Sequence, residues 1–273
     1  MSKFLLTISD LHVGSAYGII PDDFYISTGA GVSLNSGQCY LLECWEHFLS
    51  SLPEKIDVLV LNGDIVEGQN LAEQCRGLVE VDPNFQARAA AKLLEPIVER
   101  VAEVDGQRQI YMTRGSRYHV GRGGRTEEVL GIILEAVKGP HRAYTQPWLH
   151  LPVDDVLFDI AHRQSFTIRY RSMPLEREIS FFLERVGRQR KLPPNHLIIV
   201  RSHTHSGYRM YEEQYRMAIS TPCWKLQDDY AKTSITPNRM FPDNIGAVGF
   251  RIYSEEIGGK RVQTIPYLYS HPE

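Results

Sequence analysis

Two histidines separated by one residue, His203 and His205, are the side chains of this chain that by type and spacing best suit metal chemistry. They follow residues 197–200, an apolar run that is typical of a buried strand. Loops at the carboxyl ends of such strands are where open α/β sheets bind ligands, and imidazoles in one loop can reach neighbouring metal ions. Alone, the pair is equally typical of two solvated loop histidines. A metal site therefore requires partners elsewhere in the chain.

Acidic and histidine side chains follow three further apolar runs. They are Asp10 and His12 after residues 4–9, Asp64 after residues 56–61, and His162 after residues 153–161. A carboxylate and an imidazole at one strand end can share a cation. Gly63 permits the tight turn that would bring the Asp64 carboxylate beside Asp10 and His12. Each motif alone predicts only a turn, but their recurrence at successive strand ends favours one shared site.

A basic loop follows the apolar run at residues 109–112. Its arginines, with glycines between them, are Arg114, Arg117, Arg122 and Arg125. Guanidinium groups suit phosphate oxygens, so we expect a phosphate-binding rim that includes Arg114, Ser116 and Arg122. A solvated basic loop is the alternative. The glycine spacing matches neither the Walker A pattern nor the GxGxxG pattern, so no nucleotide-binding loop is predicted.

The remaining pattern predicts alternating helices and strands that would position these loops. Helices are expected over residues 38–51, 82–104 with a kink at Pro96, 125–137, and from an N-cap at Ser172 to Val186. Further strands are expected at 216–220, 246–253 and 261–265, and a long irregular excursion at residues 15–37. No repeat or linker divides the chain, so one domain over residues 1–273 is expected.

Composition limits the classes of protein that this chain can be. Hydrophobic residues make up 42% and charged residues 23%, with a formal net charge of −3, which argues against a general polyanion binder. The four cysteines form no metal-binding spacing and are expected to be free thiols of a reducing compartment. No signal peptide and no apolar stretch of roughly 20 residues is found. A cytoplasmic protein with no membrane partner is expected.

The ordered motifs, taken together, resemble those of the calcineurin-like metallophosphoesterases. They are Asp-x-His at 10–12, Gly-Asp at 63–64, a glycine-containing loop with a histidine at 115–119, the histidine at 162, and His-x-His at 203–205. The resemblance covers most of the chain. It implies an α/β (α+β) fold of two packed mixed β-sheets flanked by helices, a four-layer sandwich, with a two-metal site at the strand ends.

The resemblance also implies how two divalent metal ions would be bound. One metal is expected on Asp10, His12 and His205, and Asp64 is expected to bridge to a second metal that His162 and His203 complete. Imidazoles favour Mn, Fe, Zn or Ni over Mg, and Mn is our first expectation. Two cations roughly 3.5–4 Å apart can activate a bridging hydroxide and neutralise phosphoryl charge.

The third motif departs from the family pattern. The family's Gly-Asn-His-Asp is replaced here by the sequence Gly-Ser-Arg-Tyr-His at residues 115–119, in which His119 is expected to supply the catalytic acid. Three explanations stay open. The second metal is weak, Glu67 replaces the missing asparagine, or Arg117 stabilises the charge of the transition state. Ser202 stands where the family has glycine, a small change that should be tolerated.

These expectations lead to a metal-dependent phosphoesterase, and to a phosphodiesterase or nuclease in preference to a monoesterase. The basic third motif suits a nucleic acid or nucleotide, and Tyr118 could stack on a base. Two alternatives remain. One is a scaffold or binding protein that kept the fold and lost turnover; the other is a serine/threonine protein phosphatase.

Overall fold

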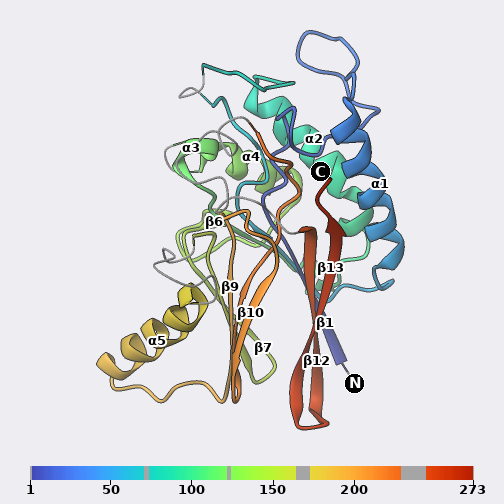
Figure 1. The fold of residues 1–273 in the computed structure, drawn as a ribbon. Coiled ribbons are helices and arrows are strands. Elements are labelled where there is room, and N and C mark those ends of the chain that lie inside the picture. Colours follow the sequence, from blue (N-terminus) through green and yellow to red (C-terminus); the bar gives the residue numbers. More distant parts are fainter. Residues whose placement is uncertain (1, 71–73, 122–123, 164–172, 229–243, 273) are drawn as a thin grey trace.

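The computed structural model describes residues 2–70, 74–121, 124–163, 173–228 and 244–272 (Figure 1). Two mixed β-sheets form its centre. The six-stranded sheet has the order β13 (Lys260–Ser270), β12 (Asn244–Ile257), β1 (Ser2–Ile8), β2 (Val58–Asn62), β5 (Ile110–Thr113), β6 (Thr145–Gln146). The five-stranded sheet has the order β10 (Arg209–Glu213), β11 (Arg216–Ser220), β9 (His196–Arg201), β8 (Val156–Ile160), β7 (Leu149–Val153). Strands β1, β2, β5 and β6 are parallel in the first sheet, and β8, β9 and β11 are parallel in the second.

Successive side chains along the central strands face different layers, because side chains alternate across a strand. In β1, Leu5 belongs to the core between the two sheets, whereas its neighbour Leu6 belongs to the core under the helices of the six-stranded sheet. In β9, Val200 faces the other sheet and Ile199 faces a helix. Both faces of these strands are therefore covered, which explains their nearly continuous apolar sequences.

Helices cover the outer face of each sheet (Figure 1). Helices α1 (Ser36–Ser51), α2 (Pro83–Val98) and α4 (Arg125–Ile133) pack on the six-stranded sheet, and α5 (Met173–Arg188) packs on the five-stranded sheet. Helix α1 begins with a capping box in which Asn35 and Gln38 exchange hydrogen bonds. The order helix, sheet, sheet, helix confirms the predicted four-layer fold of two mixed sheets flanked by helices.

The helix predicted over residues 82–104 ends earlier than expected. Helix α2 stops at Val98, two residues after Pro96, which lies in its last turn. Val101 then forms an isolated bridge with Ile56, and Val104 ends the short strand β3 (Glu103–Val104), which pairs with β4 (Gln107–Arg108). Val101 and Val104 therefore lie in paired extended segments, although their spacing suggested a continuation of the helix.

Two other elements differ from their predictions. The strand expected over residues 153–161 is present as β8 but begins only at Val156, because Val153 ends β7, which pairs with β8 across a turn at residues 154–155. The helix expected over residues 125–137 ends at Ile133, and Glu135 adopts a left-handed backbone. Strand β10 and the short helix α3 (Arg117–Val120) were not predicted. The proposed N-cap Ser172 lies outside the described residues.

No helix among the described residues is long and apolar enough to cross a bilayer. The four cysteines are free thiols, as their spacing predicts.

Candidate metal centre

The six predicted metal ligands follow four central strands, two from each sheet. Asp10 and His12 follow β1, Asp64 follows β2, His162 follows β8, and His203 and His205 follow β9. Backbone hydrogen bonds join neighbouring loops: the amide of Asp10 donates to the Gly63 carbonyl, and the amide of Ser202 donates to the His162 carbonyl, both at 3.0 Å. The sheets thus bring together side chains that are up to 195 residues apart in sequence.

Five of these six residues have a left-handed backbone. The φ angles are 51° for Asp10, 49° for His12, 50° for Asp64, 76° for His203 and 48° for His205. Such a conformation costs a non-glycine residue about 1–2 kcal/mol. Strained backbone of this kind concentrates at functional sites, where the surrounding structure holds it in place. The repeated strain at these residues, together with their convergence, makes this edge of the sheets the candidate functional site.

The first group of potential ligands consists of Asp10, His12 and His205. The Asp10 Oδ1 atom lies 3.0 Å from His205 Nε2 and 3.7 Å from His12 Nε2. The two Nε2 atoms are 3.1 Å apart. Asp10 and His12 are fully buried, whereas the side chain of His205 is 21% exposed. This group therefore has a buried base and one side open to solvent.

The second group consists of Asp64, His162 and His203. The Asp64 Oδ2 atom lies 2.8 Å from His162 Nε2 and 3.6 Å from His203 Nδ1. The Asp10 Oδ1 atom is 4.0 Å from His162 Nε2, so it connects the two groups. The bridging role expected of Asp64 stays a prediction. So do the ligand roles of all six residues.

Glu67 lies beside the first group. One of its carboxylate oxygens is 2.7 Å from His12 Nδ1, and the buried Lys225 Nζ lies 3.4 Å from the same oxygen. A carboxylate that accepts the Nδ1–H of a histidine leaves the Nε2 lone pair free for a metal. With His12 and His119, Glu67 forms a third group of potential ligands. Glu67 therefore belongs with His12. A replacement for the family's asparagine would instead lie in the Asp64 group, where the second metal is expected.

The buried carboxylates and histidines of the centre shift one another's pKa values. Burial opposes ionisation of Asp10 and Asp64, but nearby histidines hold the pKa of both carboxyl groups well below its ordinary value. Burial likewise lowers the pKa of His162, and the two carboxylates outweigh it and raise that pKa to about 10. Buried carboxylates require a positive partner. A proton on His162 supplies one here, and divalent cations would fit the same oxygen and nitrogen donors.

The backbone amide of Ser116 donates to Asp64 Oδ1 at 2.7 Å. The Ser116 hydroxyl is buried and has no hydrogen-bond partner among the described residues. An unpaired hydroxyl next to a buried carboxylate fits a site that takes a polar group.

His119 contacts the centre through His12 and Glu67. Its ring centroid is 4.5 Å from that of His12, and its Nδ1 atom lies 3.0 Å from the Glu67 carbonyl oxygen. Burial lowers the pKa of His119 to about 4. The neutral ring donates Nδ1–H to the carbonyl, which leaves Nε2 as an acceptor. To act as the expected acid, His119 must take up a proton when an anionic ester binds.

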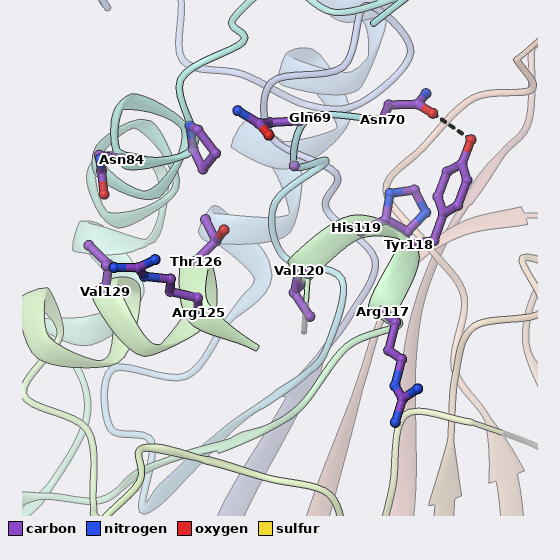
Figure 2. A pocket seen from close by; sticks show the side chains of 13 residues that line it. Gln69, Asn70, Asn84, Arg117, Tyr118, His119, Val120, Arg125, Thr126 and Val129 are labelled. Atoms are coloured by element: carbon purple, nitrogen blue, oxygen red, sulfur yellow. Dashed lines mark hydrogen bonds between the residues drawn. The ribbon is translucent and has the colours of Figure 1, made fainter. Parts of the chain in front are cut away.

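The two described arginines of the third motif, Arg114 and Arg117, have different environments. Arg117 is exposed, and its side chain extends away from His119 and Tyr118 (Figure 2). The side chain of Arg114 packs against Gly124. Arg122 lies outside the described residues. The phosphate-binding roles expected of Arg114, Ser116 and Arg122, and the catalytic role of Arg117, stay predictions.

Two glycines and a carboxylate fix the loop that carries Asp64. A Cβ added to Gly63 would lie 2.7 Å from His162 ring atoms, and one added to Gly115 would lie 2.3 Å from Asp64 Oδ1. The carboxylate of Glu127 accepts hydrogen bonds from the amides of Ile65 and Gly115, at 3.2 and 2.8 Å. Sequence reasoning noticed Gly63 but missed Glu127, because a glutamate in the first turn of a helix is an ordinary feature.

Lys225 was also missed. It lies 158 residues from Glu67 and belongs to no recognisable motif. Its position in the loop after β11 was the available signal, because the loops after β1, β2, β8 and β9 all carry candidate ligands.

No protein-family model and no curated protein matches this sequence. Similar solved structures include vacuolar protein sorting 29 from Cryptosporidium parvum, with 12% identity, a TM-score of 0.44 and coverage of 98% of both chains. The phosphoesterase YfcE from E. coli has 16% identity and a TM-score of 0.39, over 92% of this chain and 88% of that one. Vps29 from Entamoeba histolytica, complexed with zinc, has 9% identity and a TM-score of 0.42, over 97% of this chain and 99% of that one. Likenesses at this level assign neither a family nor an activity to this chain.

Proposed function

We propose that this protein is a metallophosphoesterase of the calcineurin-like type that hydrolyses phosphodiesters. The observation that carries the proposal is the pair of ligand groups, Asp10–His12–His205 and Asp64–His162–His203, on adjoining loops of two packed sheets. Two cations held close together are the usual means of hydrolysing phosphate esters. When bound, the cations supply Lewis-acid activation of water and of the phosphoryl group.

The charge of the centre favours an anionic substrate. Each ligand group contains one carboxylate and two imidazoles, so two divalent cations would keep an excess of positive charge. The negative charge of Glu67 is already offset by Lys225, which lies 5% exposed beside it. A phosphate ester satisfies this excess of positive charge better than a neutral amide or carboxylic ester does.

The residues of the chain have separate tasks in this proposal. The six ligands hold the cations, Glu67 orients His12, and His119 transfers a proton to the leaving oxygen. Arg117 and Arg114 belong to the basic rim that attracts the phosphate. We favour a diester over a monoester because the cavity lined by His119 could accommodate a second ester substituent.

Turnover of model esters tests this proposal. Metal-stripped protein resupplied with manganese should cleave bis(p-nitrophenyl) phosphate faster than p-nitrophenyl phosphate, with two ions bound per chain. Asp64→Asn should lose the second ion and reduce kcat at least about 100-fold. Asp57→Asn is the matched control, because Asp57 precedes β2 at its other end and, within the described part of the chain, its carboxylate bonds only to Lys55 and the Phe4 amide.

The Arg117→Ala variant should lower kcat/KM on the diester if the guanidinium stabilises the transition state. Manganese binding without turnover of either ester would overturn the proposal and favour a metal-binding scaffold. Cleavage of phosphoserine peptides in preference to the diester would favour a protein phosphatase.

A further inference from the structure

A cavity of about 800 Å³ lies next to the metal centre. It is formed between the loop after β2, the start of α2, the short helix α3 and the first turns of α4 (Figure 2). This volume falls within the range of roughly 300–1,000 Å³ that is usual for small-molecule sites. The cavity is separate from the two ligand groups, and its lining shares with the centre's third group only His119.

The floor of the cavity is held in place by the buried side chain of Gln86. Its Oε1 accepts from the Gly68 amide at 2.7 Å, and its Nε2 donates to the Gly68 carbonyl at 2.8 Å. Gly68 in turn packs against the His119 carbonyl so closely that an added Cβ would lie 1.7 Å from that oxygen. The Gly68 side of the cavity is therefore held against the backbone of His119.

The walls combine apolar surface with amides that have no partner. Pro83 and Val129 supply apolar surface, and Tyr118 supplies a ring that is 45% exposed, with its hydroxyl bonded to Asn70. Across the described part of the chain, the side-chain amides of Gln69 and Asn84 make no hydrogen bond, although both line the cavity. An amide offers a donor and an acceptor side by side, which matches the edge of a nucleobase.

Cationic side chains lie at the same cavity. Arg117 and Arg125 line it, are exposed, and form no ion pair with any described residue. Free guanidinium groups suit the phosphates that flank a nucleoside, and can also stack on a base. A purely apolar ester substituent would use neither the amides nor these charges.

We infer that this cavity binds the nucleoside on the leaving-group side of the scissile phosphodiester, with its base between the apolar wall and the amides of Gln69 and Asn84. The inference rests on the proposed function, since it identifies the substrate class of that same centre. His119 decides which side of the ester enters. It lines the cavity and contacts His12, so a leaving oxygen within its reach carries its substituent into the cavity.

The test compares a variant that fills the cavity with one that does not. Val129→Trp fills it from α4, and Ile132→Trp makes the same kind of change at a 60% exposed position of the same helix, outside the lining. Asn84→Ala is a second, milder variant at an exposed position, which guards against misfolding of Val129→Trp. Circular dichroism confirms that each variant is folded.

Two readouts are measured on the full chain resupplied with manganese. The first is binding of deoxyadenosine, with deoxyribose as the control, by calorimetry or NMR shifts. The second is kcat/KM for the dinucleotide dApdA divided by kcat/KM for bis(p-nitrophenyl) phosphate. We expect Val129→Trp to weaken nucleoside binding and lower the ratio at least about ten-fold, and Asn84→Ala to lower both about three- to ten-fold. Ile132→Trp should equal the wild type.

The two readouts separate failure of this inference from failure of the proposed function. If both esters are cleaved but neither Val129→Trp nor Asn84→Ala changes the ratio of their kcat/KM values, the nucleoside site is overturned. The proposed phosphodiesterase activity is then still supported. If neither ester is cleaved, the proposed function is overturned. The inferred nucleoside site is then judged by the nucleoside-binding measurement alone. Binding that Val129→Trp removes supports it, whereas binding of deoxyadenosine no stronger than of deoxyribose overturns it.

Discussion

Replacement of Glu67 by glutamine removes the charge that orients His12 and preserves the size of the side chain. The Glu67 carboxylate is 2% exposed and accepts from His12 Nδ1 at 2.7 Å. Loss of a carboxylate that orients a ligating histidine typically costs about 10–100-fold in metal affinity. The amide oxygen of glutamine can still accept the Nδ1–H bond, so only the charge is lost. We therefore expect Glu67→Gln to weaken manganese binding about 10–30-fold and Glu67→Ala, which also removes the acceptor, about 100-fold.

The effect on folding should be smaller than the effect on metal binding. Lys225 loses the Glu67 charge but keeps Asp228 at 2.8 Å, so no buried cation is left without a carboxylate. Competition with a fluorescent chelator measures manganese affinity, and urea denaturation measures the free energy of unfolding. Glu80→Gln is the matched control, because Glu80 is also 2% exposed and, among the described residues, its carboxylate accepts hydrogen bonds only from Ser27 and the Asp82 amide. Manganese affinity in Glu67→Gln within two-fold of the Glu80→Gln value would refute the orienting role.

Three further changes test the buried parts of the centre and of the second sheet. Gly63→Ala and Gly106→Ala both place alanine at a left-handed backbone, with φ of 77° and 76°, but only the new Cβ at residue 63 meets the His162 ring, at 2.7 Å. Denaturation should show a free energy of unfolding lower by about 1–2 kcal/mol for Gly106→Ala, and lower by at least about 1 kcal/mol more for Gly63→Ala. Of the two variants, only Gly63→Ala should weaken manganese binding. Because carboxylates overcome burial to raise the pKa of His162 to about 10, that ring carries a proton at pH 7. Manganese should displace the proton, so affinity should rise with pH, and calorimetry in buffers of different ionisation enthalpy should detect a release that His162→Gln abolishes. Asp159 is buried against Arg201 at 2.7 Å, and Asp159→Asn should cost about 3 kcal/mol at pH 7. Burial opposes ionisation, but hydrogen bonds and Arg201 lower the pKa of Asp159 to about 2, so this cost should be full above pH 4 and shrink as the pH falls toward 2.

The six candidate ligands could be selected from the sequence because each follows a strand whose identity the apolar pattern reveals. The four strands β1, β2, β8 and β9 are nearly continuous in Val, Ile, Leu and Phe, since both of their faces are covered. Polar residues directly after such runs then stand out. That local contrast favours one shared site at the strand ends, whereas the division of the strands between two sheets was implied only by the family resemblance.

Features that depend on pairing between distant segments could not be predicted in the same way. The period of the valines at residues 101 and 104 continued that of α2, but the bridge from Val101 to Ile56 and the turn at Gly106 ended the helix. Likewise, the lysine that balances Glu67 comes from a loop 158 residues away. Local periodicity carries no information about such partners, because the energy that decides them is released only when the layers pack.

The two ligand groups are divided between the sheets in a way that connects metal binding to the packing of the layers. In the first group, Asp10 and His12 come from the six-stranded sheet and His205 from the five-stranded sheet. In the second, Asp64 comes from the six-stranded sheet, and His162 and His203 come from the other. Neither sheet alone has a complete group, so any cation bound here would join the two sheets at the edge of their shared core. The left-handed backbone at five of the ligands can be maintained for the same reason: the strain at each loop is opposed by packing of both sheets, whose inner faces meet through Phe158 and Phe250 at a centroid distance of 5.3 Å.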